Sequence, residues 1–155
     1  MTGPNPTDRG KQGTKRSLLV DGRGVPLGVA VAGANRNDHL VLEQTLDGSP
    51  AGGPKPAVAS EQGLWLDKGD AYAAVEATVR SYGYVPHIVP RDAERQLRET
   101  IPGYRARRWP VERTHSWMNR FRRILVRWEK KIENYTGMVH LVCAFIAFKQ
   151  AGLLG

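Results

Sequence analysis

Short apolar segments that predict strands are interspersed with segments that predict helices along this chain of 155 residues, and their order limits the folds open to it. Segments 17–21 and 25–32 flank Gly22-Arg23-Gly24, a tight-turn sequence that predicts a β-hairpin. Further strands are expected at 64–66 and 85–89, and helices at 38–46, with Asp38 as a candidate cap, and at 71–82, with Gly83 as a stop. This order predicts one mixed α/β domain over residues 1–155, of which residues 1–15 form an extended arm.

The positive charge of the chain is concentrated in one region. Residues 91–131 hold 13 Lys and Arg against 5 Asp and Glu, so their net charge equals the +8 of the whole chain. A helix is expected to begin at Pro110, because proline suits the first helical position. Its core stripe is predicted from apolar positions spaced by three and four residues. These positions are Val111, Thr114, Met118, Phe121, Leu125 and Trp128.

The apolar carboxy-terminal segment and the single cysteine indicate where in the cell the chain is expected to act. Residues 135–154 predict a helix that is apolar on most sides and therefore buried. The longest apolar run, 138–148, is too short to span a membrane, so no membrane partner is expected. Cys143 is the single cysteine, which excludes an internal disulfide and fits a reducing, cytoplasmic location.

Two carboxylates are candidates for chemistry. Asp67 ends the apolar segment 64–66, and strand ends in open α/β sheets are places where sites are built. Glu112 lies in the first turn of the basic helix, where the helix dipole favours a carboxylate. Both suit a hard divalent cation such as Mg²⁺. The plainer interpretations stay open: a solvated turn aspartate, and an ion pair of Glu112 with Arg108 or Arg113.

Cations interleaved with aromatic residues follow Glu112 and suit binding to a DNA backbone. Each neutralised phosphate adds affinity that is independent of sequence and weakens with salt. The alternative is a charged face that contacts only solvent. The candidate DNA-binding residues are Arg113, Arg120, Arg122, Arg123, Arg127, Lys130 and Lys131.

Four stretches together resemble segments of bacterial insertion-sequence transposases of the DDE type, in the IS-five family. They are 3–16 (GPNPTDRGKQGTKR), 33–38 (GANRND), 66–69 (LDKG) and 108–123 (RWPVERTHSWMNRFRR). The resemblance implies an RNase-H-like fold, a mixed sheet with flanking helices. It assigns Asp67 as the second catalytic and metal-binding acid, Glu112 as the third, and Arg108 as the arginine that precedes the glutamate.

The same resemblance implies DNA transposition, with Mg²⁺ or Mn²⁺ as cofactor and with element ends and target DNA as partners. Two bound ions would activate a water or a DNA 3′-hydroxyl and stabilise the phosphate. In the family the first catalytic aspartate lies upstream of the segment that resembles 3–16. Asp8 and Asp21 match non-catalytic positions, so the first strand and its aspartate are expected to be missing.

Different functional classes follow from that expectation. The chain is either the carboxy-terminal part of a split or frameshifted transposase, completed by an upstream segment, or an inactive DNA-binding remnant. Alone it is expected to be inactive. A homodimer is left open, and a basic RNA-binding protein would require the resemblance to be accidental.

Overall fold

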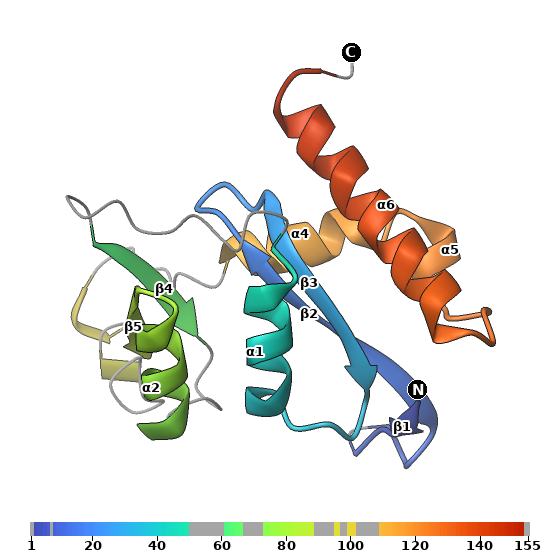
Figure 1. Cartoon of the computed structure of the whole chain (residues 1–155), viewed down its shortest axis with the longest axis horizontal. Helices are drawn as coiled ribbons and strands as arrows, with labels where there is room; N and C mark the ends of the chain where they lie inside the picture. Colours follow the sequence, from blue (N-terminus) through green and yellow to red (C-terminus); the bar gives the residue numbers. More distant parts are fainter. Residues whose placement is uncertain are drawn as a thin grey trace. The chain divides into compact units, whose positions relative to one another are not determined.

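The computed structural model describes residues 2–6, 8–49, 61–66, 73–88, 95–96, 99–101 and 109–153. The chain forms two compact units, one made of Met1–Gly53 with Pro110–Gly155 and the other of Pro54–Trp109. The mixture of strands and helices agrees with the expected α/β class (Figure 1). Asp67 and Arg108, two of the candidate site residues, lie outside the described residues.

A long antiparallel hairpin forms the centre of the first unit. Strand β2 (Gln12–Val20) pairs with β3 (Pro26–Gly33), with a register shift between Leu19 and Val20. Asp21 closes the turn, because its Oδ1 accepts the backbone N–H groups of Arg23 and Val25, each at 2.8 Å. Gly24 follows with a φ of +83°, which favours glycine. The hairpin predicted from Gly22-Arg23-Gly24 is therefore confirmed.

The amino-terminal residues, for which the sequence predicts an extended arm, pair with the hairpin. Strand β1 (Gly3–Pro4) runs antiparallel to the start of β2, pairing Gly3 with Gly13. The backbone N–H of Asn5 bonds the carbonyl of Lys11 at 2.8 Å, which closes the loop between them. The first unit thus contains a three-stranded sheet of order β1-β2-β3.

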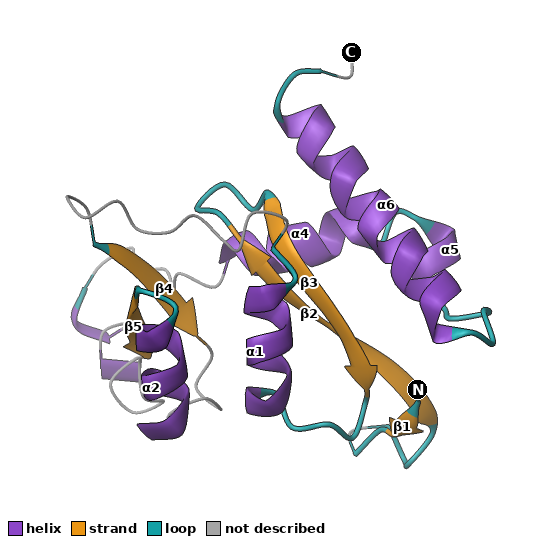
Figure 2. Ribbon diagram, in the orientation of Figure 1, coloured by secondary structure: helices purple, strands orange, loops and turns teal. Residues whose placement is uncertain are grey.

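Helices cover both faces of the β2–β3 hairpin, because alternate side chains of a strand point to opposite faces. On one face, Ala30 and Ala32 pack against Val41 of helix α1 (His39–Asp47), which runs beside the hairpin in Figure 2. On the other face, Leu18 and Val29 join the larger hydrophobic core. That core also takes side chains from helices α4 (Trp109–Met118), α5 (Arg122–Leu125) and α6 (Ile132–Gln150).

The helix predicted at 38–46 is confirmed, but its cap is not. Asp38 occupies the N-cap position without a side-chain capping hydrogen bond. Its carboxylate instead pairs with the ammonium of Lys15 on β2, at 2.7 Å. An ion pair across the two elements thus takes the side chain that the sequence assigned to the helix end.

The basic helix is shorter than its apolar stripe suggests. Thr114 and Met118 are fully buried as predicted, but α4 ends at Met118. In the short helix α5 that follows, Ile124, which is not part of the predicted stripe, is the residue that is completely buried. Leu125 and Trp128 are 53% and 77% exposed, so the prediction that they continue the core stripe is wrong.

The last helix is amphipathic in its burial, although it is apolar on most sides. Tyr135, Val139 and Ile146 of α6 are buried in the core of the first unit. Leu141 and Phe148 are 70% and 52% exposed, so the expectation of a fully buried helix is wrong. Uniform apolarity along a helix does not indicate which side meets a partner, and here one side has none among the described residues.

The second unit contains a parallel strand pair connected through a helix. Strand β4 (Gln62–Leu66) pairs with β5 (Tyr84–Ile88), and helix α2 (Ala73–Ser81) packs against β5. Val75 and Val79 form the buried side of α2. Gly83 ends it with a φ of +83°. The strands and helix predicted here are confirmed, with shifted ends.

Within the parts of the chain that the structure describes, none of the helices combines the length and apolar character that crossing a bilayer requires.

Candidate functional site

Helix α4 carries Glu112, the one candidate acid that the structure describes. Glu112 lies in the first turn and its side chain is exposed. The buried side of α4 is formed by Thr114 and Met118. Among the described residues, no hydrogen bond or ion pair involves the Glu112 carboxylate. An ion pair with Arg113, one of the plainer interpretations of Glu112, is therefore not formed.

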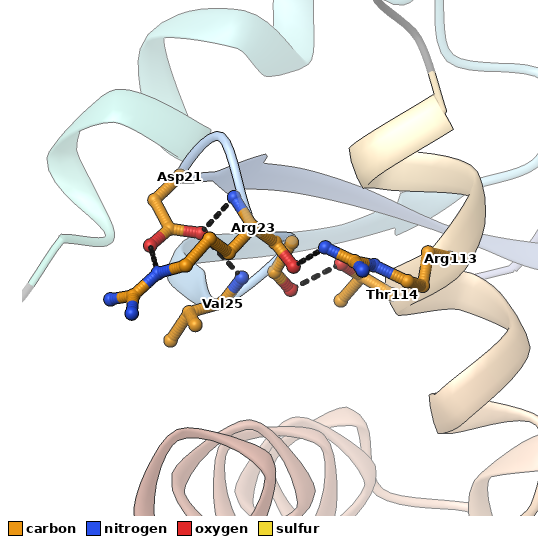
Figure 3. Close-up of polar contacts among 6 residues, drawn as sticks. Asp21, Arg23, Val25, Arg113 and Thr114 are labelled. Carbon is orange, nitrogen blue, oxygen red and sulfur yellow. Dashed lines mark hydrogen bonds and ion pairs between the residues drawn. The ribbon is translucent and has the colours of Figure 1, made fainter. Parts of the chain in front are cut away.

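The hairpin turn holds the beginning of α4 (Figure 3). The Arg113 guanidinium donates to the main-chain carbonyl of Arg23. The Thr114 hydroxyl contacts the carbonyl oxygen of Gly24 and lies 2.9 Å from that of Pro110. These contacts satisfy carbonyls of the turn and fix the helix that carries Glu112.

The predicted DNA-binding cations divide into two groups by their contacts. Arg113 is partly buried, with its guanidinium 5.0 Å from the ring centre of Trp117. Arg127 is also partly buried and donates to main-chain carbonyls and to Thr14. Both therefore hold the structure together. The remaining cations are exposed: Arg120, Arg122, Arg123, Lys130 and Lys131.

Arg16, a residue not singled out from the sequence, connects β2 to the basic segment. Its Nη2 donates to Asn119 Oδ1 at 3.2 Å, and its Nη1 donates to the carbonyl of Ile124 at 3.4 Å. The two contacts bridge the end of α4 and α5. An arginine within a strand shows no pattern that would have revealed this role, because its partners lie more than one hundred residues away.

Two titratable groups of this core have shifted pKa values. Burial lowers the pKa of His115, and the positive charge of Arg16 lowers it further. Burial raises the pKa of the Cys143 thiol to about 11, although Arg16 opposes the shift. Cys143 is buried, as its apolar surroundings in the sequence predicted.

A metal centre requires several ligands in one place. Among the described residues, no three His, Cys, Asp or Glu side chains lie close enough to hold a metal ion. Asp21 and Asp8 have other partners: Asp21 closes the hairpin turn, and Asp8 lies 3.5 Å from the ammonium of Lys11. Of the proposed ligands the structure describes Glu112, whose exposed carboxylate suits a hard cation.

Comparison with known proteins places the chain in a family. Residues 2–146 match the family described as "Transposase DDE domain". The chain is 33% identical, over 154 residues, to a putative transposase for insertion sequence element IS402 from Burkholderia cepacia; the match covers 95% of this chain and 68% of that protein. No solved structure matches significantly. This protein therefore belongs to the family of transposases that carry the DDE domain.

Proposed function

We propose that this chain binds the DNA ends of an insertion sequence and contributes Asp67 and Glu112 to a metal-dependent site for DNA cleavage and strand transfer. The family match over residues 2–146 carries the proposal. The exposed Glu112 in the first turn of a firmly held helix supports it, because a metal ligand must be accessible and well positioned. Arg108 assists at the same site by binding DNA phosphate.

Asp67 and Glu112 would hold Mg²⁺ or Mn²⁺, since carboxylate oxygens are the preferred ligands of such cations. A bound ion supplies activation of a water or a 3′-hydroxyl and stabilisation of the reacting phosphate. An RNase-H-like fold and membership of the IS-five family belong to the same proposal. Within the units, the antiparallel β2–β3 pair and the parallel β4–β5 pair support that fold.

Complete activity is proposed to require one further carboxylate, the first catalytic aspartate, supplied by an upstream segment of the transposase. The proposed partners are element-end DNA, target DNA and that segment. We place this activity in the cytoplasm and propose a homodimer as its assembly. The competing function is a remnant that binds DNA without cleaving it. The two functions differ in one outcome, because only the first yields joined DNA products when the upstream segment is supplied.

A strand-transfer assay on element-end DNA tests the proposal. Joined products are expected with Mg²⁺ when the upstream segment is supplied, and Asp67→Ala or Glu112→Gln should abolish them. Glu133→Gln is a matched control, because Glu133 is also an exposed glutamate in the first turn of a helix. Activity that survives Glu112→Gln would overturn the metal-site assignment, and DNA binding without products would support the remnant.

A further inference from the structure

The end of α5 and the loop that joins it to α6, residues 125–131, expose apolar side chains that neighbour cations in the sequence. Leu125 and Val126 are each 53% exposed, and Trp128 is 77% exposed. Trp128 is the most exposed large hydrophobic side chain among the described residues. Neighbouring apolar side chains left in water indicate a binding surface more often than a single exposed residue does.

The loop is held in shape around Trp128 by the residue before it. The Arg127 guanidinium donates to the carbonyls of Glu129 and Lys130, at 3.0 and 3.1 Å. It also donates to Thr14 Oγ1 on β2 at 3.1 Å. These bonds fix the backbone on the carboxy-terminal side of Trp128 and join the loop to the sheet. The indole is therefore presented to solvent by an ordered backbone, which lowers the entropic cost of binding.

The side chain of Tyr135 supports Arg127 through a second set of contacts. Its guanidinium carbon lies 5.9 Å from the ring centre of Tyr135, a buried residue of α6. The Tyr135 hydroxyl donates to the carbonyl of Ile124 at 3.0 Å. Arg127 and Tyr135 thus connect both ends of the loop to the core, while Trp128 takes no part in that packing.

The charges around Trp128 identify the kind of ligand. Arg122, Arg123, Lys130 and Lys131 are exposed on either side of it in the sequence. Glu129 is the acid within this stretch, and its carboxylate lies 3.5 Å from Arg123. The stretch 122–131 therefore carries a net positive charge. An aromatic platform among cations is the arrangement by which proteins hold unpaired bases, with the ring stacking on the base and the cations neutralising phosphates.

We propose that Trp128 stacks on an unpaired nucleobase at a DNA strand end, with Arg123, Lys130 and Lys131 contacting the adjoining phosphates. The inference rests on the proposed DNA binding and adds to it a preference for DNA that exposes a base face. A duplex buries its base faces within the stack, so Trp128 distinguishes frayed or tailed ends from continuous duplex. The flanking cations contact phosphate in both forms.

Equilibrium binding of the full chain to two DNA probes tests this inference. One probe is a duplex with a short single-stranded 3′ tail that ends in 2-aminopurine. The other is the same duplex closed at both ends by non-nucleotide linkers. Trp128→Ala should weaken binding to the tailed probe about tenfold and leave binding to the closed duplex within about twofold. It should also remove the quenching of 2-aminopurine fluorescence that stacking produces.

Three further variants separate stacking from other effects. Trp128→Phe keeps an aromatic face and should retain most of the tailed-probe affinity. Phe148→Ala removes an exposed aromatic residue from α6 and should change neither probe. The double variant Lys130→Ala/Lys131→Ala should weaken both probes. Because Trp128 is mostly exposed, its replacement is not expected to unfold the chain.

Each outcome has a defined meaning. If the wild-type chain binds neither probe, the proposed DNA binding fails. If both probes bind and Trp128→Ala weakens them equally or not at all, the stacking inference fails while DNA binding stands. Trp128-dependent binding to vesicles that contain anionic lipid, without any preference for the tailed probe, would also overturn stacking and assign the loop to a membrane surface.

Discussion

Gly24 lies directly against Thr114, although ninety residues separate them in the sequence. A Cβ at position 24 would come within 3.1 Å of Thr114 Oγ1 and 2.9 Å of the Pro110 carbonyl oxygen. The φ of +83° at Gly24 adds a second reason for glycine. The hairpin turn and the helix that carries Glu112 are therefore fitted to each other.

Replacing Gly24 by alanine should consequently destabilise the first unit. Gly24→Ala combines an unfavourable backbone conformation with close contacts to α4, so we expect a loss of about 2 kcal/mol in the free energy of unfolding. Gly22→Ala is the matched control, because nothing lies within 4 Å of a Cβ at that position. Urea denaturation followed by circular dichroism measures both. Equal stability of the two variants would contradict the fit between Gly24 and α4.

Truncation of two arginines of the basic segment, Arg127 and Arg122, should affect stability to different extents. Arg127→Ala removes hydrogen bonds to Thr14 and to two main-chain carbonyls, so we expect a loss of about 2 kcal/mol in stability. Arg122→Ala removes an exposed cation and should change stability by less than about 0.5 kcal/mol. Chemical denaturation of both variants checks the difference. Similar losses would show that Arg127 has no special structural role.

The affinity for DNA should instead depend on Arg122, whose truncation leaves stability almost unchanged. Arg122→Ala should lower duplex affinity and reduce the slope of log affinity against log salt by about one, as the loss of one phosphate contact predicts. The affinity of the wild-type chain should itself fall steeply as salt rises. Filter binding over a series of salt concentrations provides the measurement. A slope that Arg122→Ala leaves unchanged would remove this residue from the DNA interface.

Acidification should destabilise the fold through His115. Because the folded state lowers the pKa of His115 below its ordinary value of 6.5, the unfolded chain takes up a proton first as the pH falls. Stability is therefore lost as the pH decreases through that value, and the loss is complete below the folded-state pKa. His115→Gln should flatten this part of the curve of unfolding free energy against pH. A variant curve parallel to that of the wild type between about pH 7 and pH 5 would contradict it.

The thiol of Cys143 should be nearly inert in the folded chain. Its pKa of about 11 leaves little of the reactive thiolate at neutral pH, and burial excludes the reagent. Labelling by iodoacetamide should be slow in buffer and should accelerate when urea unfolds the chain. Mass spectrometry of the labelled fraction follows both reactions. Rapid labelling without denaturant would indicate that the core around α6 opens readily.

The sequence by itself determined the features that depend on neighbouring residues. The hairpin follows from Gly22-Arg23-Gly24, and the α/β order follows from local patterns of apolar residues. Glu112 was placed correctly in the first turn of a helix, because Pro110 lies one residue after the helix begins at Trp109. The assignments of Glu112 and Asp67 as metal ligands, and of Arg108 as a catalytic residue, stay predictions.

Tertiary structure decided which side chains of the basic segment meet the core and which meet solvent. The chain leaves helical geometry after Met118 and again at Val126, whose φ is −119°. Because the helix is interrupted at these two places, apolar residues spaced by three and four no longer share one face. Ile124 is therefore buried, whereas Trp128 is exposed. They are stabilised by bonds from Arg16 to Ile124 and from Arg127 to Thr14, across more than one hundred residues. A local pattern contains no information about such partners, because only the folded chain brings them together.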